Sequence, residues 1–99
     1  MSAKSRIDVK PLSGESGHRF EVTVREKNGE TRHEVTVSER ELERFGGGGG
    51  EPAALVEESF RFLLAREPKE SILGKFALSV IAQYFPEYPD EIARRVAKR

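Results

Sequence analysis

The 99-residue chain contains no cysteine, no tryptophan and no long apolar segment. The absence of cysteine excludes disulfides, thiolate nucleophiles and cysteine-ligated metals. No apolar run approaches the ~18 residues that a membrane-spanning helix requires, and the polar start of the chain lacks the pattern of a secretory signal. We therefore expect a cytoplasmic protein with no membrane partner.

The sequence also lacks an excess of charge of either sign. Seventeen lysines and arginines balance seventeen acidic residues, so the formal net charge at pH 7 is zero. An electroneutral chain gains little of the counterion release on which nucleic-acid affinity depends. Hydrophobic residues make up 36% and charged residues 34% of the chain, against roughly 45–50% and about 25% in typical domains. This composition predicts a single domain over residues 1–99, with a modest core and a densely charged surface.

Sequence motifs of catalysis are missing as well. The chain has no Gly-x-Ser-x-Gly nucleophile motif, no His-Glu-x-x-His zinc motif and no Asp-rich calcium loop. Its two histidines, His18 and His33, fall six positions apart along the expected strand ladder, or about 20 Å at ~3.3 Å per residue, too far to share a metal ion. We expect no catalytic residue, no metal site and no cofactor, and hence a protein that is not an enzyme. A catalytic site assembled from His33 and scattered carboxylates is a third hypothesis for the function.

A run of five glycines, residues 46–50, divides the chain into two parts with different apolar spacing. Apolar residues alternate with polar ones in residues 1–45 and recur at helical intervals in residues 51–99. The run does not match a phosphate-binding loop, because no Lys-Ser or Lys-Thr pair follows it and Glu51 adds a negative charge. We interpret residues 46–50 as a linker.

The first part is predicted to form three antiparallel strands, near residues 5–11, 18–27 and 30–38. Asn28-Gly29 is typical of a type I′ hairpin turn, in which both residues take a positive φ. A loop made of these two residues pairs Val24 with His33 and places the large apolar residues of the hairpin on one face. A capping box of Ser38 and Glu41 then predicts a short helix that ends near residue 45.

The second part is predicted to contain three to five short helices. Pro52 suits the first position of a helix that reaches about Arg66, and its wide apolar face suggests contacts on two sides. Further helical stretches are expected from about Lys69, up to Pro86 and from Pro89. The expected fold is therefore α+β, a three-stranded antiparallel β-meander followed by a helical C-terminal half.

One shared core is the first interpretation of these two parts. The expected core residues are Phe20, Val22, Val24, Val35 and Val37 from the strands, and Phe60, Leu63, Leu64, Ile72, Leu73, Phe76, Ile81 and Phe85 from the helices. The alternative is a nearly independent helical bundle, with the hairpin packed against another copy of itself. The glycine run permits both arrangements.

One long segment resembles a known type of sequence. Residues 62–73, with the sequence FLLAREPKESIL, are followed by FALSVI at 76–81 and YFPEY at 84–88. This pattern is similar to that of a family of small uncharacterised bacterial proteins. The resemblance implies a bacterial and cytoplasmic protein, and it transfers no functional residue.

Two hypotheses for the function come from different classes. The first is a non-enzymatic protein-interaction or regulatory module whose partner is another protein, a second copy included. It rests on the missing catalytic set, on the wide apolar face of the Pro52 helix and on a hairpin whose first or last strand would be an open edge for strand addition. The second is nucleic-acid binding, because aromatic rings beside basic residues can stack on bases. The candidate binding residues for this second hypothesis are Tyr84, Tyr88, Arg94, Arg95, Lys98 and Arg99.

Overall fold

A four-stranded sheet with helices on one side forms the framework of the protein. The computed structural model describes residues 5–12, 18–46 and 51–97. Along the chain the elements are β1 (Arg6–Leu12), β2 (His18–Glu26), β3 (Gly29–Val37), α1 (Glu39–Gly46), α2 (Pro52–Leu64), the 3-10 helix η1 (Lys69–Ser71), β4 (Lys75–Ala77), α3 (Val80–Tyr84) and α4 (Tyr88–Ala97). The sheet order is β1-β2-β3-β4, with β1 to β3 antiparallel and β4 parallel to β3. The α+β class and the meander are confirmed, and β4 is an additional strand.

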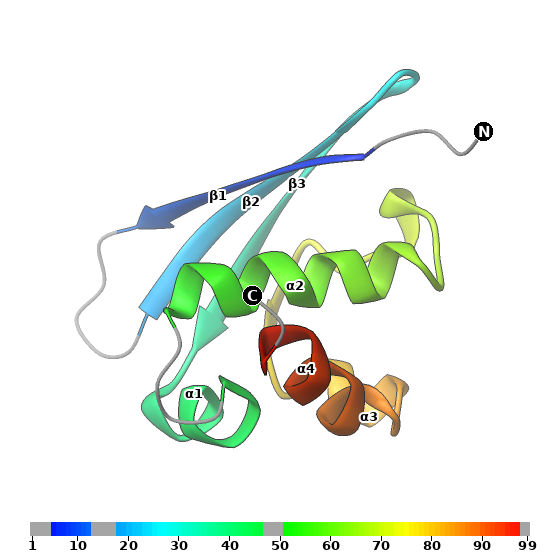
Figure 1. Cartoon of the computed structure of the whole chain (residues 1–99). Helices are drawn as coiled ribbons and strands as arrows, with labels where there is room; N and C mark the ends of the chain where they lie inside the picture. Colours follow the sequence, from blue (N-terminus) through cyan, green and yellow to red (C-terminus); the bar gives the residue numbers. More distant parts are fainter. Residues whose placement is uncertain (1–4, 13–17, 47–50, 98–99) are drawn as a thin grey trace.

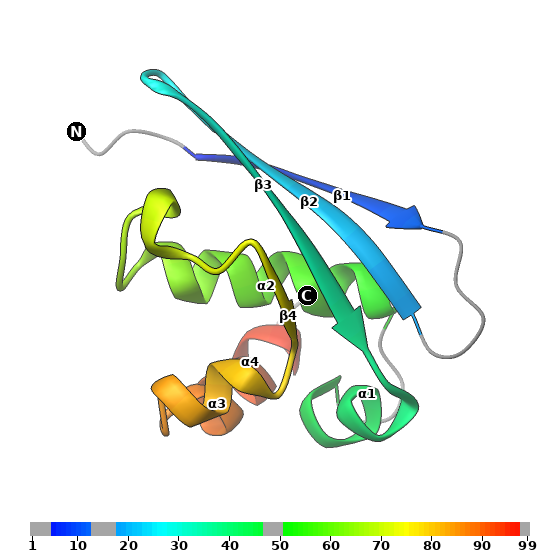
Figure 2. The same ribbon diagram turned by 180° about the vertical axis from the view of Figure 1, so that it is seen from behind.

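Helix α2 lies in the middle of the molecule, with the sheet on one side and α4 on the other (Figures 1 and 2). The Phe60 ring faces the sheet side, where its centroid lies 6.0 Å from that of Phe76. Phe62 faces the other side, and its centroid is 5.2 Å from that of Tyr88 at the start of α4. The expectation that this helix makes apolar contacts on two sides is confirmed. No helix among the described residues is long and apolar enough to cross a membrane.

The hairpin forms as predicted, but its turn lies one residue earlier. Glu26 pairs with Gly29, so Lys27 and Asn28 are the loop residues. Within the described residues only a glycine takes a positive φ, namely Gly29 at 138°, which excludes a type I′ turn at Asn28-Gly29. The Asn28 side chain instead accepts a hydrogen bond from the Lys69 ammonium at 3.2 Å, a tertiary contact that local sequence does not reveal.

The predicted pairing of the hairpin is therefore wrong by two residues, although its faces are right. Val22, not Val24, lies opposite His33, and Phe20 lies opposite Val35. A shift of two residues keeps every side chain on its face because side chains alternate with a period of two. The apolar residues of β2 and β3 accordingly face the helices and are buried.

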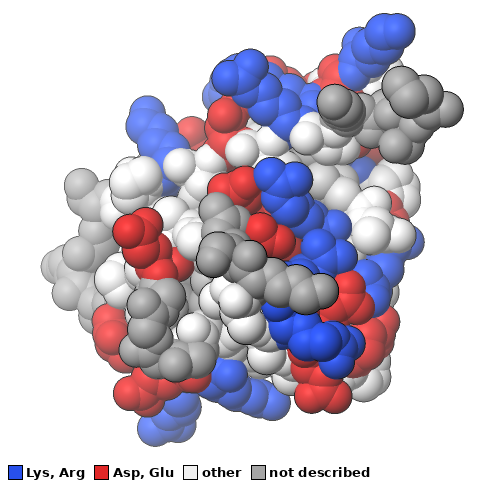
Figure 3. Space-filling model, in the orientation of Figure 1, with Lys and Arg blue, Asp and Glu red and all other residues white. Residues whose placement is uncertain are grey.

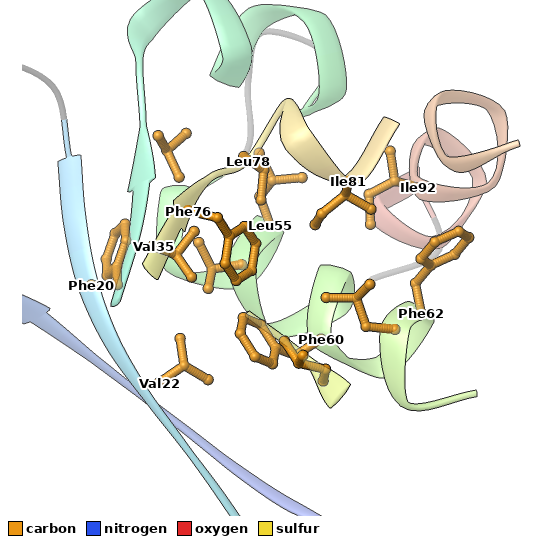
Figure 4. Close-up of a cluster of buried hydrophobic side chains, with 14 of the residues drawn as sticks. Phe20, Val22, Val35, Leu55, Phe60, Phe62, Phe76, Leu78, Ile81 and Ile92 are labelled. Carbon is orange, nitrogen blue, oxygen red and sulfur yellow. The ribbon is translucent and has the colours of Figure 1, made fainter. Parts of the chain in front are cut away.

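The core joins both parts of the chain, as the close-up in Figure 4 shows. This excludes, for the described residues, a helical bundle separate from the hairpin. Leu73 departs from the expectation because 45% of its surface is exposed, and Leu64 and Phe85 are only half-buried. The buried hydrophobic residues are Phe20, Val22, Val24, Val35, Val37, Phe45, Leu55, Val56, Phe60, Phe62, Leu63, Ile72, Phe76, Leu78, Ile81, Tyr88 and Ile92.

The helix expected from about Lys69 does not form. The chain makes the single turn η1 and then enters the sheet as β4. The Glu34 amide donates to the Gly74 carbonyl at 2.8 Å, and the Leu78 amide donates to the Thr36 carbonyl at 3.0 Å. Pairing with β3, some 40 residues away in the sequence, thus replaces the hydrogen bonds that a helix would have made.

The capping box at the start of α1 is confirmed. The Ser38 amide donates to Glu41 Oε1 at 2.8 Å, and the Glu41 amide donates to Ser38 Oγ at 3.0 Å. Glu41 Oε2 accepts a further bond from the Ser79 amide at 2.8 Å, which ties α1 to the start of α3. Burial alone would raise the pKa of Glu41, but these hydrogen bonds outweigh burial and lower its pKa. Of the predicted linker, Gly46 is the buried last residue of α1, and residues 47–50 lie outside the described part.

Candidate functional site

Tyr88, one of the candidate binding residues, lies in the core. It is fully buried, and its hydroxyl is 2.7 Å from Ser59 Oγ on α2. Ser59 in turn donates to the Leu55 carbonyl at 2.7 Å, so the shared hydrogen comes from Tyr88. Burial raises the pKa of Tyr88, despite the hydrogen bond to Ser59. A ring in this position is not available to stack on a base.

The other candidate binding residues do not share one environment. Tyr84 on α3 has 66% of its surface exposed, and Arg94 on α4 is exposed. Arg95 is bound within the protein, at 3.0 Å from Glu91 and 4.0 Å from Glu58. The last two candidates, residues 98 and 99, lie outside the described part of the chain.

Basic side chains are interspersed with acidic ones on the face that carries α2 and α4. Figure 3 shows both signs of charge side by side over this surface. Arg66, for example, donates to Glu87 at 3.0 Å and to Glu91 at 2.9 Å while its guanidinium lies 3.7 Å from the centroid of the Phe62 ring. Arg66 is thus occupied by internal partners, and the mixture of signs among the described residues of this face is unlike the continuous basic surface that binds a phosphate backbone.

The two histidines have structural contacts in different places. His18 at the start of β2 lies 3.1 Å from a Glu39 carboxylate oxygen. His33 is buried on the helix-facing side of β3, where its Nδ1 donates to the Leu73 carbonyl at 2.8 Å. Within the described ranges, no group of three or more histidine or acidic side chains is placed to hold a metal ion.

A groove of about 380 Å³ lies between the C-terminal end of α2, the segment from η1 through β4, and α3. Its volume falls within the ~300–1,000 Å³ that ligand pockets usually occupy. We call it the apolar groove, because most of its walls are aliphatic or aromatic. The residues that line it are Leu63, Glu67, Ser71, Ile72, Leu73, Phe76, Val80, Ile81, Tyr84 and Phe85.

Two large hydrophobic side chains are exposed in the described structure, Leu73 and Tyr84, and both line the apolar groove. Leu73 lies two residues before the start of β4, and Tyr84 is the last residue of α3. Tyr84 was predicted from the sequence to be a binding residue, whereas Leu73 was expected in the core. Gly74, which follows Leu73, interrupts the helical spacing of apolar residues and is the sequence signal that could have indicated that the chain leaves the core here.

Glu67 is the only charged side chain among the residues that line the apolar groove. It is half-buried, just beyond the end of α2. Its carboxylate makes no hydrogen bond or ion pair with any residue that the structure describes. The groove therefore combines apolar walls with one unpaired negative charge.

Lys69 connects η1, which forms one wall of the groove, to the tip of the β2–β3 hairpin. The side chain of Lys69 is only 1% exposed, and its ammonium lies 3.1 Å from Glu26 and 2.6 Å from Glu70, besides its bond to Asn28. Its hydrogen bond to Glu70 raises the pKa of Lys69 and lowers that of Glu70. Together with the bond from His33 to Leu73, these contacts hold the segment that leads into β4.

Comparison of the chain with protein-family models, with curated proteins and with solved structures finds no match. The bacterial family that the sequence resembles thus gains no support from these comparisons.

Proposed function

We propose that this protein is a non-enzymatic interaction module that binds a segment of another protein in the apolar groove. The observation that carries the proposal is the position of Leu73 and Tyr84. They are the large hydrophobic side chains that the described structure exposes, and they line the same groove. Scattered exposed apolar residues need no explanation, whereas a contiguous apolar surface marks an interaction site.

The proposed binding surface, the apolar groove, differs from the one predicted from the sequence, the apolar face of α2. The wide apolar face of α2 is used inside the protein, by the sheet and by α4, and is not free for a partner. The groove instead offers an exposed tyrosine, a residue type enriched at the energetic centres of interfaces. A bacterial cytoplasmic setting remains a prediction from the sequence.

Nucleic-acid binding, the second hypothesis from the sequence, finds less support in the structure. Of its candidate residues, Tyr88 is buried and Arg95 is paired with Glu91 and Glu58. Among the candidates that the structure describes, this leaves Tyr84 and Arg94, which provide one ring and one exposed cation. No observation favours this function over a protein partner.

Selection of peptides from a displayed random library tests the proposal. The library is selected on the wild-type protein, and the enriched peptides are then titrated against Tyr84→Asp and Leu73→Asp. Gln83→Asp is the matched control, because Gln83 is the exposed neighbour of Tyr84 on α3 and does not line the groove. We expect binding to weaken about tenfold or more in the two groove variants, as for loss of an interface anchor, and to be unchanged in the control.

Two outcomes contradict the proposal. One is a selection that enriches no binding peptide, and the other is a set of peptides that bind Tyr84→Asp and wild type equally well. Light scattering of the same variants covers self-association. A concentration-dependent dimer that Tyr84→Asp abolishes would identify a second copy of the chain as the partner in the groove.

A further inference from the structure

β4 is an edge strand, and the hydrogen bonds of its ladder fix which backbone groups are free. The Gly74 carbonyl and the Leu78 amide both bond to β3. In a parallel ladder, alternate residues turn both their amide and their carbonyl to the same neighbouring strand. Lys75 and Ala77 therefore direct their amides and carbonyls away from β3, and no described residue hydrogen-bonds to these groups.

The free edge of β4 borders the apolar groove. Phe76, the middle residue of β4, points to the helix side and lines the groove, and Leu73 and Val80 line it just before and just after the strand. Figure 2 shows β4 at the end of the sheet, with α3 following on from it. Because side chains alternate along a strand, every second side chain of a strand added beside β4 would enter the groove.

The opposite edge of the sheet does not offer the same opportunity. β1 contains Pro11, which has no amide hydrogen to donate to an added strand. It also packs against α2 rather than beside a groove lined with exposed apolar residues. Edge strands protected by proline are one of the ways in which proteins prevent unwanted strand addition.

The charge of the groove lining further restricts which ligand can bind there. Glu67 is the one charged residue of the groove lining, and its carboxylate is unpaired within the described structure. A half-buried carboxylate beside apolar walls favours a ligand that brings a cationic group to it. Neither a purely apolar segment nor an acidic one complements this lining.

We propose that the segment bound in the groove is an extended peptide that adds to β4 as a fifth strand. Its amides and carbonyls pair with those of Lys75 and Ala77, its alternate apolar side chains enter the groove, and a lysine or arginine lies against Glu67. This inference rests on the proposed function, since it specifies the partner of the same groove. Main-chain hydrogen bonds fix the alignment of such a peptide, and the pockets for alternate side chains provide its specificity.

N-methylation of a selected peptide, one residue at a time, tests the strand pairing. Each N-methyl group removes one amide donor, so methylation at the residues that pair with β4 weakens binding about fivefold, since one hydrogen bond is worth on the order of 1 kcal/mol. Methylation at the intervening residues leaves the affinity nearly unchanged. The expected signature is a sensitivity that alternates with a period of two. A helical or irregular ligand gives no such alternation.

Charge reversal tests the role of Glu67. Glu67→Lys should weaken the selected peptide about tenfold and bind better a peptide in which its own lysine or arginine is replaced by glutamate. Glu43→Lys, at an exposed position of α1 that does not line the groove, is the control for net charge. We expect it to leave both affinities unchanged.

The outcomes separate this inference from the proposed function. Peptides that depend on Tyr84 but show no alternation, or no response to Glu67→Lys, overturn the fifth strand or the cationic contact and leave the interaction module standing. A selection that yields no peptide, or only peptides indifferent to Tyr84→Asp, overturns both.

Discussion

The buried hydroxyl pair of Ser59 and Tyr88 gives a prediction in which a second mutation repairs the first. Tyr88 donates to Ser59 Oγ, and Ser59 donates to the Leu55 carbonyl, each at 2.7 Å and with both hydroxyl-bearing residues fully buried. Ser59→Ala leaves the Tyr88 hydroxyl without an acceptor. A buried polar group that loses its partner lowers the free energy of unfolding by about 1–3 kcal/mol.

Tyr88→Phe removes the Tyr88 hydroxyl instead. It leaves no buried donor without an acceptor, because the Ser59 hydroxyl keeps its hydrogen bond to the Leu55 carbonyl. A hydrogen bond lost in this way costs about 0.5–1.5 kcal/mol. In the double variant both hydroxyls are gone, so the penalty for the stranded Tyr88 group disappears. The rings of Phe45 and Phe62, with centroids 5.0 and 5.2 Å from that of Tyr88, provide apolar surroundings that accept a phenylalanine.

We therefore expect Ser59→Ala/Tyr88→Phe to be more stable than Ser59→Ala alone, by about 1 kcal/mol. The gain in helix propensity from serine to alanine is common to both proteins and cancels in this comparison. Urea denaturation followed by far-ultraviolet circular dichroism measures the difference, and Tyr84→Phe at the exposed position is the control. A double variant less stable than Ser59→Ala would refute the reasoning that Ser59→Ala leaves the buried Tyr88 hydroxyl without a partner.

Three further predictions concern pH and backbone geometry. Because burial raises the pKa of Tyr88 above its usual 10.0, the unfolded chain ionises first; stability therefore falls as the pH rises above about 10, and urea midpoints should fall faster in wild type than in Tyr88→Phe. The hydrogen bond from Lys69 lowers the pKa of Glu70 below its usual 4.5, so this contribution to stability is present above that pH and lost below it. Acid titration of Lys69→Met should accordingly show a shallower loss of stability than that of wild type. Gly29→Ala should lower the free energy of unfolding by about 1–2 kcal/mol, because its φ of 138° is unfavourable for alanine, whereas thermal melts of Gly74→Ala should show no loss, since a Cβ there meets no atom within 4 Å.

Local signals in the sequence were sufficient for much of the fold. The capping box of Ser38 and Glu41 forms with both predicted hydrogen bonds, and Pro52 begins α2. These features depend on residues within one helical turn of each other, so they can be predicted without knowledge of the tertiary structure. The hairpin turn was found for the same reason, but its position was wrong by one residue, and the contact of Asn28 with Lys69, 41 residues away, could not be predicted from local sequence.

The features that the sequence did not predict depend on contacts between residues far apart in the chain, above all the pairing of β4 with β3. Apolar spacing around Ile72 and Phe76 fits a helix, but the carbonyl of Gly74 accepts the Glu34 amide and the segment becomes an edge strand. This change turns Leu73 outward and creates the groove. Tyr84 was a candidate from its aromatic neighbourhood, yet nothing in the sequence distinguishes it from Tyr88, which points inward because α4 packs against α2.

Hydrogen exchange at individual amides of β4 and of Leu78, the residue after it, is the most direct test of the groove and its strand edge. In the free protein, the Leu78 amide, bonded to Thr36, should be protected, whereas the amides of Lys75 and Ala77 should exchange quickly. Saturation with a selected peptide should slow the exchange of these two amides and leave that of Leu78 little changed. Lys75 and Ala77 amides that are already protected in the free protein, or that stay unprotected when the peptide is bound, would contradict the account.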